Sequence, residues 1–177
     1  MIFATKNRGK LLEAQKFMGT ELKNSTIEIP EIQSDSLTEI AAESAKYAYE
    51  ELREPCFVED SGLFIHDLKG FPGPYSKYVY GTIGLKGVLK IMEGRENRGA
   101  EFRSVIGYAT TTEVKTFMGR VYGTIPDSPR GDQGFGYDPI FVPMKNQKTF
   151  AEDPEYKNRV SHRYASMKAF MAYLGQK

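Results

Sequence analysis

Cys56-Phe57-Val58-Glu59-Asp60-Ser61-Gly62 is the stretch that decides the fold, because an apolar run leads directly into two acids and a glycine. Pro55 ends the helical pattern before it, so Cys56-Phe57-Val58 is predicted to be a fully buried strand. Binding groups gather at the carboxyl ends of strands in α/β sheets. The four residues from Glu59 to Gly62 are therefore predicted to lie at the end of this strand.

The chain start predicts a strand, a loop and a helix. Ile2-Phe3-Ala4-Thr5 is typical of a short buried strand, and the basic stretch Thr5 to Lys10 follows as a loop. Leu11, Ala14 and Met18 then share one face of a predicted helix. A strand that leads through a loop into a helix is the first unit of an α/β fold.

A second strand and a long helix are predicted before the central stretch. Thr26 to Ile29 has the pattern of a strand, and Pro30 ends it. Ser36 and Glu39 have the spacing of a capping box. Apolar residues then recur every three or four positions toward Leu52, as an amphipathic helix requires.

The rest of the chain continues this mixture of strands and helices. The predicted elements are a loop over 70–75, a helix over 85–92, a hairpin over 101–124, a glycine-rich loop over 131–139, a strand over 140–142 and a helix from about Ser161. We therefore predict an α/β fold with a mixed central sheet and flanking helices, formed as a single domain over residues 1–177.

Composition restricts the class of protein. The chain has 24 basic and 23 acidic residues, a net charge of +1, which argues against a nucleic-acid binder. Its one cysteine, Cys56, cannot form an internal disulfide and is predicted to be a buried apolar residue. The start of the chain lacks the pattern of a secretory signal, and charges interrupt every apolar run. We expect a soluble, cytoplasmic protein without a membrane or nucleic-acid partner.

The basic loop is a candidate phosphate site. Lys6, Arg8 and Lys10 surround Asn7 and Gly9 just before a predicted helix, where backbone N–H groups add to the side-chain charge. The loop does not match the Walker A motif. A solvated basic turn is the alternative interpretation.

The adjacent acids are a candidate metal site. Two carboxylates after a buried strand are costly without a counter-ion. Since neighbouring strand residues point to opposite faces, one of the two is expected to face a ligand, and we favour Asp60 over Glu59. Glu31 can supply a second oxygen ligand, which suits Mg²⁺ or Mn²⁺ better than zinc.

Two further segments have both a functional and a structural interpretation. His162 and Arg163 begin the last predicted helix, where they would bind a base carbonyl or a phosphate, or form an ordinary exposed helix cap. Phe135 and Tyr137 would stack on a purine, or fill the core beside flexible glycines.

Taken together, these motifs resemble one enzyme family. The ordered set is Thr5-Lys6-Asn7-Arg8-Gly9-Lys10, Glu59-Asp60-Ser61-Gly62-Leu63, Phe71-Pro72-Gly73-Pro74-Tyr75-Ser76, Phe135-Gly136-Tyr137-Asp138-Pro139-Ile140-Phe141 and Ser161-His162-Arg163. In this order the segments closely resemble the inosine/xanthosine triphosphate pyrophosphatase family over nearly the whole chain. The resemblance implies hydrolysis of ITP, dITP and XTP to the monophosphate and pyrophosphate, which removes deaminated purines from the nucleotide pool.

The resemblance also implies an architecture and residue roles. The fold would be an elongated, two-lobed homodimer subunit with the active site in a cleft between the lobes. Asp60 would bind the metal and accept a proton from water, with Glu31 as the other metal ligand. The remaining implied contacts to substrate are Thr5, Lys6, Asn7, Arg8, Gly9 and Lys10 on the triphosphate, Ser61, and a nucleotide pocket of Phe135, Gly136, Tyr137, Asp138, Lys157, His162 and Arg163. Within that pocket Phe135 would stack on the base, and His162 and Arg163 would read its 6-oxo group.

One departure from the family pattern concerns a phosphate-binding lysine. Many members have this lysine at the position of Ser44. Lys46 lies two residues later, a rotation of about 200° around a helix, and Lys77 is the other candidate replacement.

Two rival functions are compatible with the same motifs. A related nucleotide pyrophosphatase that prefers pyrimidine or modified bases would share the basic loop and the acids. A catalytically silent nucleotide-binding module would share the loop but would not need the acids.

Overall fold

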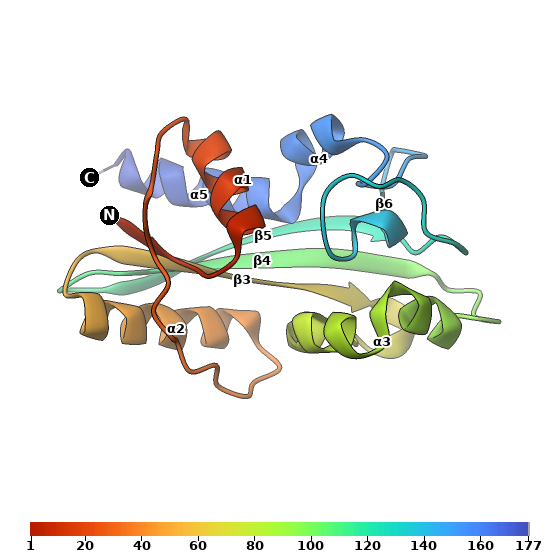
Figure 1. Ribbon diagram of the computed structural model, residues 1–177, viewed down its shortest axis with the longest axis horizontal. Helices are drawn as coiled ribbons and strands as arrows, with labels where there is room; N and C mark the ends of the chain where they lie inside the picture. Colours follow the sequence, from red (N-terminus) through yellow and green to blue (C-terminus); the bar gives the residue numbers. More distant parts are fainter. Residues whose placement is uncertain (177) are drawn as a thin grey trace. The chain divides into compact units, whose positions relative to one another are not determined.

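The computed structural model describes residues 1–176, in which strands and α-helices alternate from residue 2 to residue 109 (Figure 1). The strands are β1 (Ile2–Ala4), β2 (Lys23–Ser25), β3 (Cys56–Ile65), β4 (Gly99–Ala109), β5 (Val114–Thr124) and β6 (Val142–Pro143). The α-helices are α1 (Arg8–Met18), α2 (Leu37–Leu52), α3 (Ser76–Ile91), α4 (Pro154–Val160) and α5 (His162–Leu174). Short 3-10 helices span His66–Leu68, Gly73–Tyr75 and Asp138–Ile140. In the described part of the chain, no helix is long and apolar enough to cross a membrane.

The strands form one mixed sheet in the order β2-β1-β3-β4-β5-β6. β1 pairs in parallel with both β2 and β3, whereas β5 and β6 pair antiparallel. The predicted α/β class with a mixed sheet and flanking helices is therefore confirmed. The predicted hairpin is confirmed as well, because β4 and β5 are neighbours joined by a short turn at residues 110–113.

The chain divides into two compact units. Unit 1 contains residues 1–60, 104–119 and the described residues from Arg163 onward, and unit 2 contains residues 61–103 and 120–162. β3, β4 and β5 each contribute residues to both units. The prediction of a single domain over 1–177, whose last residue lies outside the described chain, and the prediction of a cleft between lobes stay predictions.

Unit 1 has an apolar cluster on each face of its part of the sheet. On one face Cys56 and Val58 of β3 pack with α2, where Ala45 and Ala48 are fully buried. On the other face Phe57 packs with residues of α1 and α5 and stacks on Phe3 at 4.4 Å between ring centroids. Figure 1 shows α2 on one side of the strands and α1 with α5 on the other. This arrangement fixes which helix each residue of β3 faces.

The prediction that Cys56 is a buried apolar residue is confirmed. Its thiol is buried among apolar residues, and burial raises the pKa of this thiol to about 11. A thiol with this pKa is almost wholly protonated at neutral pH and is a poor nucleophile.

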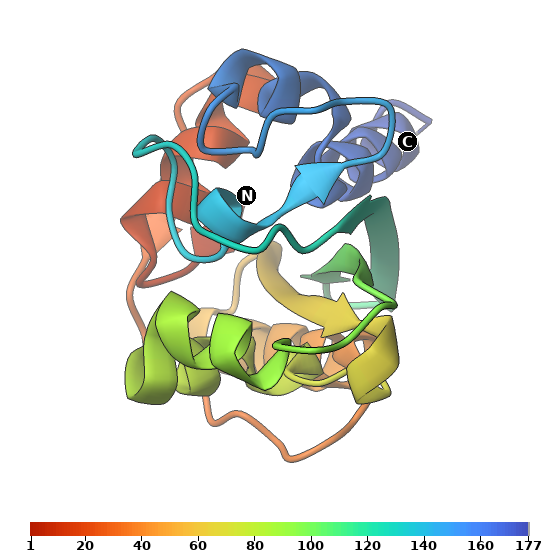
Figure 2. The same cartoon turned by 90° about the vertical axis from the view of Figure 1, so that its right-hand side faces the viewer.

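Unit 2 is built around a core of aromatic and aliphatic residues. Leu63 and Ile65 of β3 pack with Phe102, Phe141 and residues of α3. Figure 2 shows α3 on one side of this end of β3 and the segment with β6 on the other. The helix breaks at Gly84, whose φ of 63° lies in the left-handed region that favours glycine. The predicted helix over 85–92 is thus the second half of a longer, kinked element.

The central strand is longer than predicted. β3 runs through Ile65, so Glu59 to Gly62 lie inside the strand rather than at its end, and that prediction is wrong. The strand continues because Leu63-Phe64-Ile65 is a second buried apolar run. Gly62 permits a close approach there, since a Cβ at this position would lie 2.2 Å from the carbonyl oxygen of Gly73.

Two other predicted strands are misplaced. Residues 26–29 have no strand assignment, because β1 pairs with 23–25 instead, and the side chains of Ile27 and Ile29 pack against the cluster under α2. The predicted strand 140–142 is reduced to β6 at 142–143. Ile140 ends a 3-10 turn, and Phe141 is buried in the core of unit 2.

The start of α2 confirms half of the predicted capping box. The Glu39 N–H donates to Ser36 Oγ at 3.3 Å. The Glu39 carboxylate does not reach back to Ser36; it accepts from Ser34 Oγ at 2.6 Å, and Ser34 Oγ accepts from the Ser36 N–H at 3.0 Å. Ser34 thus completes the cap.

Candidate functional site

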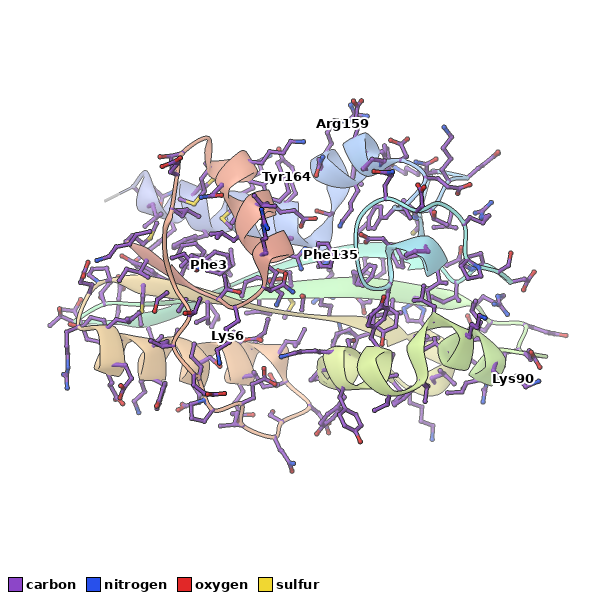
Figure 3. The ribbon with its side chains drawn as sticks, in the orientation of Figure 1. Phe3, Lys6, Lys90, Phe135, Arg159 and Tyr164 are labelled. Atoms are coloured by element: carbon purple, nitrogen blue, oxygen red, sulfur yellow. The ribbon has the colours of Figure 1, made fainter. Side chains whose placement is uncertain are left out.

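The basic loop is ordered around the first turn of α1. Thr5 Oγ1 accepts from the Asn7 N–H at 3.1 Å, and Asn7 Oδ1 accepts from the Lys10 N–H at 3.0 Å as the helix N-cap. Lys6 and Arg8 are exposed beside this turn (Figure 3). The first N–H groups of a helix have no intrahelical acceptor and carry the positive end of its dipole. This end of α1 is therefore suited to bind an anion.

Lys10 extends from this turn to the central strand. Its Nζ donates to the carbonyl oxygen of Glu59 at 2.7 Å and lies 2.9 Å from Oε2 of the same residue. The Lys10 side chain keeps 17% of its surface exposed. Lys10 thus joins the amino end of α1 to the acidic stretch of β3.

Glu59 is the buried centre of a polar cluster in unit 1. Its Oε1 accepts from Ser104 Oγ at 2.6 Å and lies 3.3 Å from Arg163 Nε. Ser104 also hydrogen-bonds to Ser166 at 2.9 Å, and Arg163 Nη1 donates to Glu13 Oε2 at 2.5 Å. Three elements besides β3 therefore supply partners to this one region: α1, β4 and α5.

The cluster keeps Glu59 ionised. Burial by itself would raise the pKa of Glu59, but Arg163, Lys10 and the Ser104 hydrogen bond outweigh it and hold this pKa well below its usual range. Burial by itself would lower the pKa of Arg163. The nearby carboxylates of Glu59 and Glu13 outweigh burial, so the pKa of Arg163 is raised. A carboxylate held in this state is a poor proton acceptor near neutral pH.

Asp60 follows Glu59 but belongs to the other face of the sheet. Cys56 and Val58 face α2, so strand alternation directs Asp60 to the α2 side and Glu59 to the α1 side. Asp60 is half-buried, and Glu31 is exposed in the segment that leads into α2. The two acids thus face opposite sides, and the prediction that Asp60 is the one that faces the ligand stays a prediction.

The donor atoms of Asp60 and Glu31 suit a magnesium ion. Mg²⁺ binds through one or two carboxylates together with waters and substrate phosphates. Within residues 1–176, no group of three or more His, Cys, Asp or Glu side chains is arranged to hold a metal. A site shared with phosphates needs no third carboxylate.

Unit 2 holds the predicted pocket residues around a buried ion pair. Asp138 Oδ2 accepts from Lys157 Nζ at 2.8 Å and from the Phe135 N–H at 2.8 Å, and both charged side chains are 4% exposed. Lys157 Nζ also lies 4.5 Å from the centre of the Phe135 ring. Phe135 is itself 37% exposed (Figure 3), so part of its surface is open to a ligand. Gly134 and Gly136 have positive φ on either side of it.

Tyr137 fills the core, which is one of the two roles that the sequence left open for it. It is buried in the core of unit 2, and its hydroxyl donates to the carbonyl oxygen of Ser76 at 2.8 Å. Burial raises the pKa of Tyr137. Of the two aromatic residues in this loop, Phe135 is the one whose ring is exposed.

His162 and Arg163 are both buried at the start of α5, so the alternative of an exposed cap is wrong. The His162 ring stacks on Phe102 at 4.6 Å between centroids. Arg163 belongs to unit 1, whereas His162 belongs to unit 2.

The predicted site residues therefore form two groups. Unit 1 holds the six residues Thr5 to Lys10, Glu31, Asp60 and Arg163, and unit 2 holds Ser61, Phe135, Gly136, Tyr137, Asp138, Lys157 and His162. A single pocket that joins both groups stays a prediction. Ser44 is buried in α2, whereas Lys46 of unit 1 and Lys77 of unit 2 are exposed, so both lysines stay candidate phosphate ligands.

Sequence reasoning missed Glu13, Ser104 and Ser166. Glu13 lies three residues after Lys10, and this spacing places both on one helix face. That signal is readable from the sequence. The two serines contact Glu59 or each other across more than forty residues of chain, and no local pattern marks them.

Comparisons with known proteins agree over nearly the whole chain. The Ham1 family profile matches residues 1–173. The chain is 51% identical over 175 residues to a dITP/XTP pyrophosphatase of Methanopyrus kandleri, covering 96% of this chain and 93% of that protein. It is 47% identical over 178 residues to a dITP/XTP pyrophosphatase of Thermococcus kodakarensis, covering 98% and 96%.

Solved structures show the same fold. The Staphylococcus aureus Ham1 protein is similar with a TM-score of 0.87 and 29% identity, and the match covers 99% of each chain. A structure of a nucleoside-triphosphatase, dITP/XTP pyrophosphatase, of Mycobacterium abscessus is similar with a TM-score of 0.76 and 33% identity, covering 96% of this chain and 97% of that one.

Proposed function

This chain belongs to the Ham1 family, and we propose that it hydrolyses non-standard purine nucleoside triphosphates such as ITP, dITP and XTP to the monophosphate and pyrophosphate. The observation that carries this conclusion is the similarity to relatives named dITP/XTP pyrophosphatase, which are 51% and 47% identical to this chain over nearly its whole length. The enzyme is therefore a hydrolase of the α–β phosphoanhydride, and it removes deaminated purines from the nucleotide pool.

The phosphate chain is proposed to bind at the start of α1. Lys6, Arg8 and Lys10 supply positive charge there, and the N–H groups of the first helical turn supply directed donors. Thr5, Asn7 and Gly9 shape the loop, since Thr5 and Asn7 accept the hydrogen bonds that order it. Charge that develops on the departing pyrophosphate would be stabilised by these groups.

Asp60 is proposed to accept the proton of the attacking water. Glu59 is a poorer candidate, because two cations and a serine hydroxyl hold its carboxylate in the ionised form. Mg²⁺, with Mn²⁺ as a substitute, is proposed to bind Asp60, Glu31 and the phosphates, where it would supply Lewis-acid polarisation. Attack on the α-phosphorus then breaks the bond to the β-phosphate and leaves the nucleoside monophosphate.

The base is proposed to bind among the unit 2 residues. Phe135 offers an exposed ring, with Lys157 held against that ring by Asp138. Ser61 and Gly136 are proposed to complete the pocket, with Tyr137 supporting this loop from the core of unit 2. Since Arg163 already contacts Glu13 and Glu59, we assign the reading of the 6-oxo group to His162.

We also propose that the enzyme is a cytoplasmic homodimer with a small-molecule substrate. Association is supported by β5, which exposes two large side chains, Met118 and Tyr122, to solvent. Balanced charge, with 24 basic and 23 acidic residues, supports a nucleotide rather than a nucleic acid as the ligand.

A panel of nucleotides tests the proposed selectivity. With Mg²⁺ and purified protein, kcat/KM for ITP, dITP and XTP is expected to exceed that for ATP by at least about 100-fold, because the amino group of adenine leaves the donors for a 6-oxo group unpaired. GTP and dTTP complete the panel. Equal use of ATP would contradict the proposal, and a preference for dTTP would favour the pyrimidine-directed rival.

A further inference from the structure

Three ion pairs connect four charged side chains of α1, β3 and α5, and we call this set the ring because its first and last members, Lys10 and Glu13, lie on the same helix. Lys10 and Glu13 lie one turn apart on α1 and so share a face. Lys10 contacts Glu59 at 2.9 Å, Glu59 contacts Arg163 at 3.3 Å, and Arg163 contacts Glu13 at 2.5 Å. Two anions alternate with two cations, so the ring is neutral and ties one face of α1 to the sheet.

Lys10 is the member through which this ring can act on a ligand. An ammonium has three N–H donors. Glu59 contacts it through a carbonyl and a carboxylate oxygen, while 17% of the side chain remains exposed. The side chains of Glu59 and Arg163 are 0% and 3% exposed. The Glu13 side chain is 16% exposed, but its carboxylate repels an anion. Any attractive contact between this ring and an anionic ligand therefore passes through Lys10.

We propose that Glu59 is a positioning residue, which together with Arg163 holds the Lys10 ammonium at the amino end of α1 for a polyphosphate. The inference rests on the proposed function, because it concerns the phosphate-binding end of α1. It separates the two adjacent acids by role: Glu59 orders the cations on the α1 side, and Asp60 is left for the chemistry on the α2 side.

The sign of one effect distinguishes positioning from simple electrostatics. Glu59→Gln removes a negative charge next to Lys10, and on Coulomb grounds alone a nearby anion should then bind more tightly. If Glu59 positions Lys10, the anion should bind more weakly, because the ammonium loses its carboxylate partner and keeps only the backbone carbonyl of residue 59. The direction of the change in anion affinity therefore decides between the two accounts.

Inorganic tripolyphosphate is a suitable probe, since its binding needs no turnover. By titration calorimetry, Glu59→Gln is expected to weaken tripolyphosphate binding about tenfold, and to raise KM for ITP by a similar factor while kcat changes by less than about threefold. Tighter or unchanged tripolyphosphate binding would overturn the proposal. A loss of kcat with an unchanged dissociation constant would also overturn it, because it would make Glu59 the proton acceptor.

Glu101→Gln is the matched control for a generic loss of stability. Glu101 is a carboxylate of β4 that is buried to the same extent and lies 2.6 Å from Arg103 and 3.9 Å from Arg120, none of which is assigned to the proposed site. Its substitution is expected to leave tripolyphosphate affinity unchanged, and an equal loss of affinity in both variants would overturn the positioning role.

If wild-type protein binds tripolyphosphate but does not cleave ITP, the proposed function fails while the test of Glu59 remains valid. If wild-type protein does not bind tripolyphosphate, the positioning role is overturned directly.

Ser104→Ala keeps the proposal testable if Glu59→Gln does not fold. This variant retains all four charges and removes only the hydroxyl that donates to Glu59 Oε1 at 2.6 Å. Tripolyphosphate binding is expected to weaken by about two- to fivefold, the cost of a loosened hydrogen bond to a charged group. Unchanged affinity in a folded Ser104→Ala protein would count against the positioning role.

Discussion

Asp60→Asn is expected to lower kcat for ITP by roughly 1,000-fold, about 4 kcal/mol of transition-state stabilisation. Asparagine has the same size as aspartate, so the half-buried site in β3 should keep its packing. The amide cannot accept a proton at neutral pH and is a weaker ligand for Mg²⁺. Steady-state kinetics with ITP and Mg²⁺, read as separate kcat and KM values, measure the effect.

Asp127→Asn is the control for this experiment. The Asp127 side chain is 95% exposed and lies 3.4 Å from Arg98, so its substitution should leave kcat unchanged. A fully active Asp60→Asn enzyme would contradict the assignment of Asp60. The pair Asp60→Asn and Glu59→Gln should also differ in kind, since the first should lower kcat and the second should raise KM.

Asp138→Asn is expected to lower the free energy of unfolding by about 3–5 kcal/mol, because it removes the carboxylate that accepts from the buried Lys157 ammonium. Lys157→Met should lower the free energy of unfolding by a similar amount, because it leaves the buried Asp138 carboxylate without its cation. The double variant should lose less than the sum of the two, since no buried charge is then left without its partner. Urea unfolding measures all three, and the melting temperature of each single variant should fall by roughly 10 °C.

Lys90→Met is the matched control for the buried pair. Lys90 Nζ lies 2.7 Å from Glu93 Oε2, nearly the distance of the buried pair, but both side chains are largely exposed. Solvent screens such a contact, so no measurable loss of stability is expected. If Asp138→Asn proves as stable as wild type, or if the single losses are additive, Asp138 and Lys157 are not coupled as the distances indicate.

Local signals in the sequence predicted the elements that local chemistry controls. Ser36 caps α2 because its side chain competes well for the first N–H groups, and the four-residue turn between β4 and β5 follows from polar residues between two apolar runs. The basic loop before α1 was predictable as well, because hydrogen bonds between residues two or three positions apart order it. The central strand was found but cut short, because Asp60, Ser61 and Gly62 look like a turn whereas pairing within the sheet keeps them extended.

Long-range contacts explain what the sequence did not predict. The role of Glu59 depends on Arg163 and Ser104, which lie far away in the chain. Only the folded structure therefore shows that partners stabilise the negative charge of its carboxylate. Tyr137 was open to two interpretations because an aromatic residue beside glycines suits a core as well as a ligand. Its burial and the hydrogen bond to Ser76 decide between them.

Hydrolysis of ITP in H₂¹⁸O tests the central claim most directly, because the position of the label shows which phosphorus atom water attacks. Attack at the α-phosphorus predicts one labelled oxygen in IMP and none in pyrophosphate, with the two products formed in equal amounts by wild type and not by Asp60→Asn. Label in pyrophosphate, or release of orthophosphate with IDP, would contradict the account.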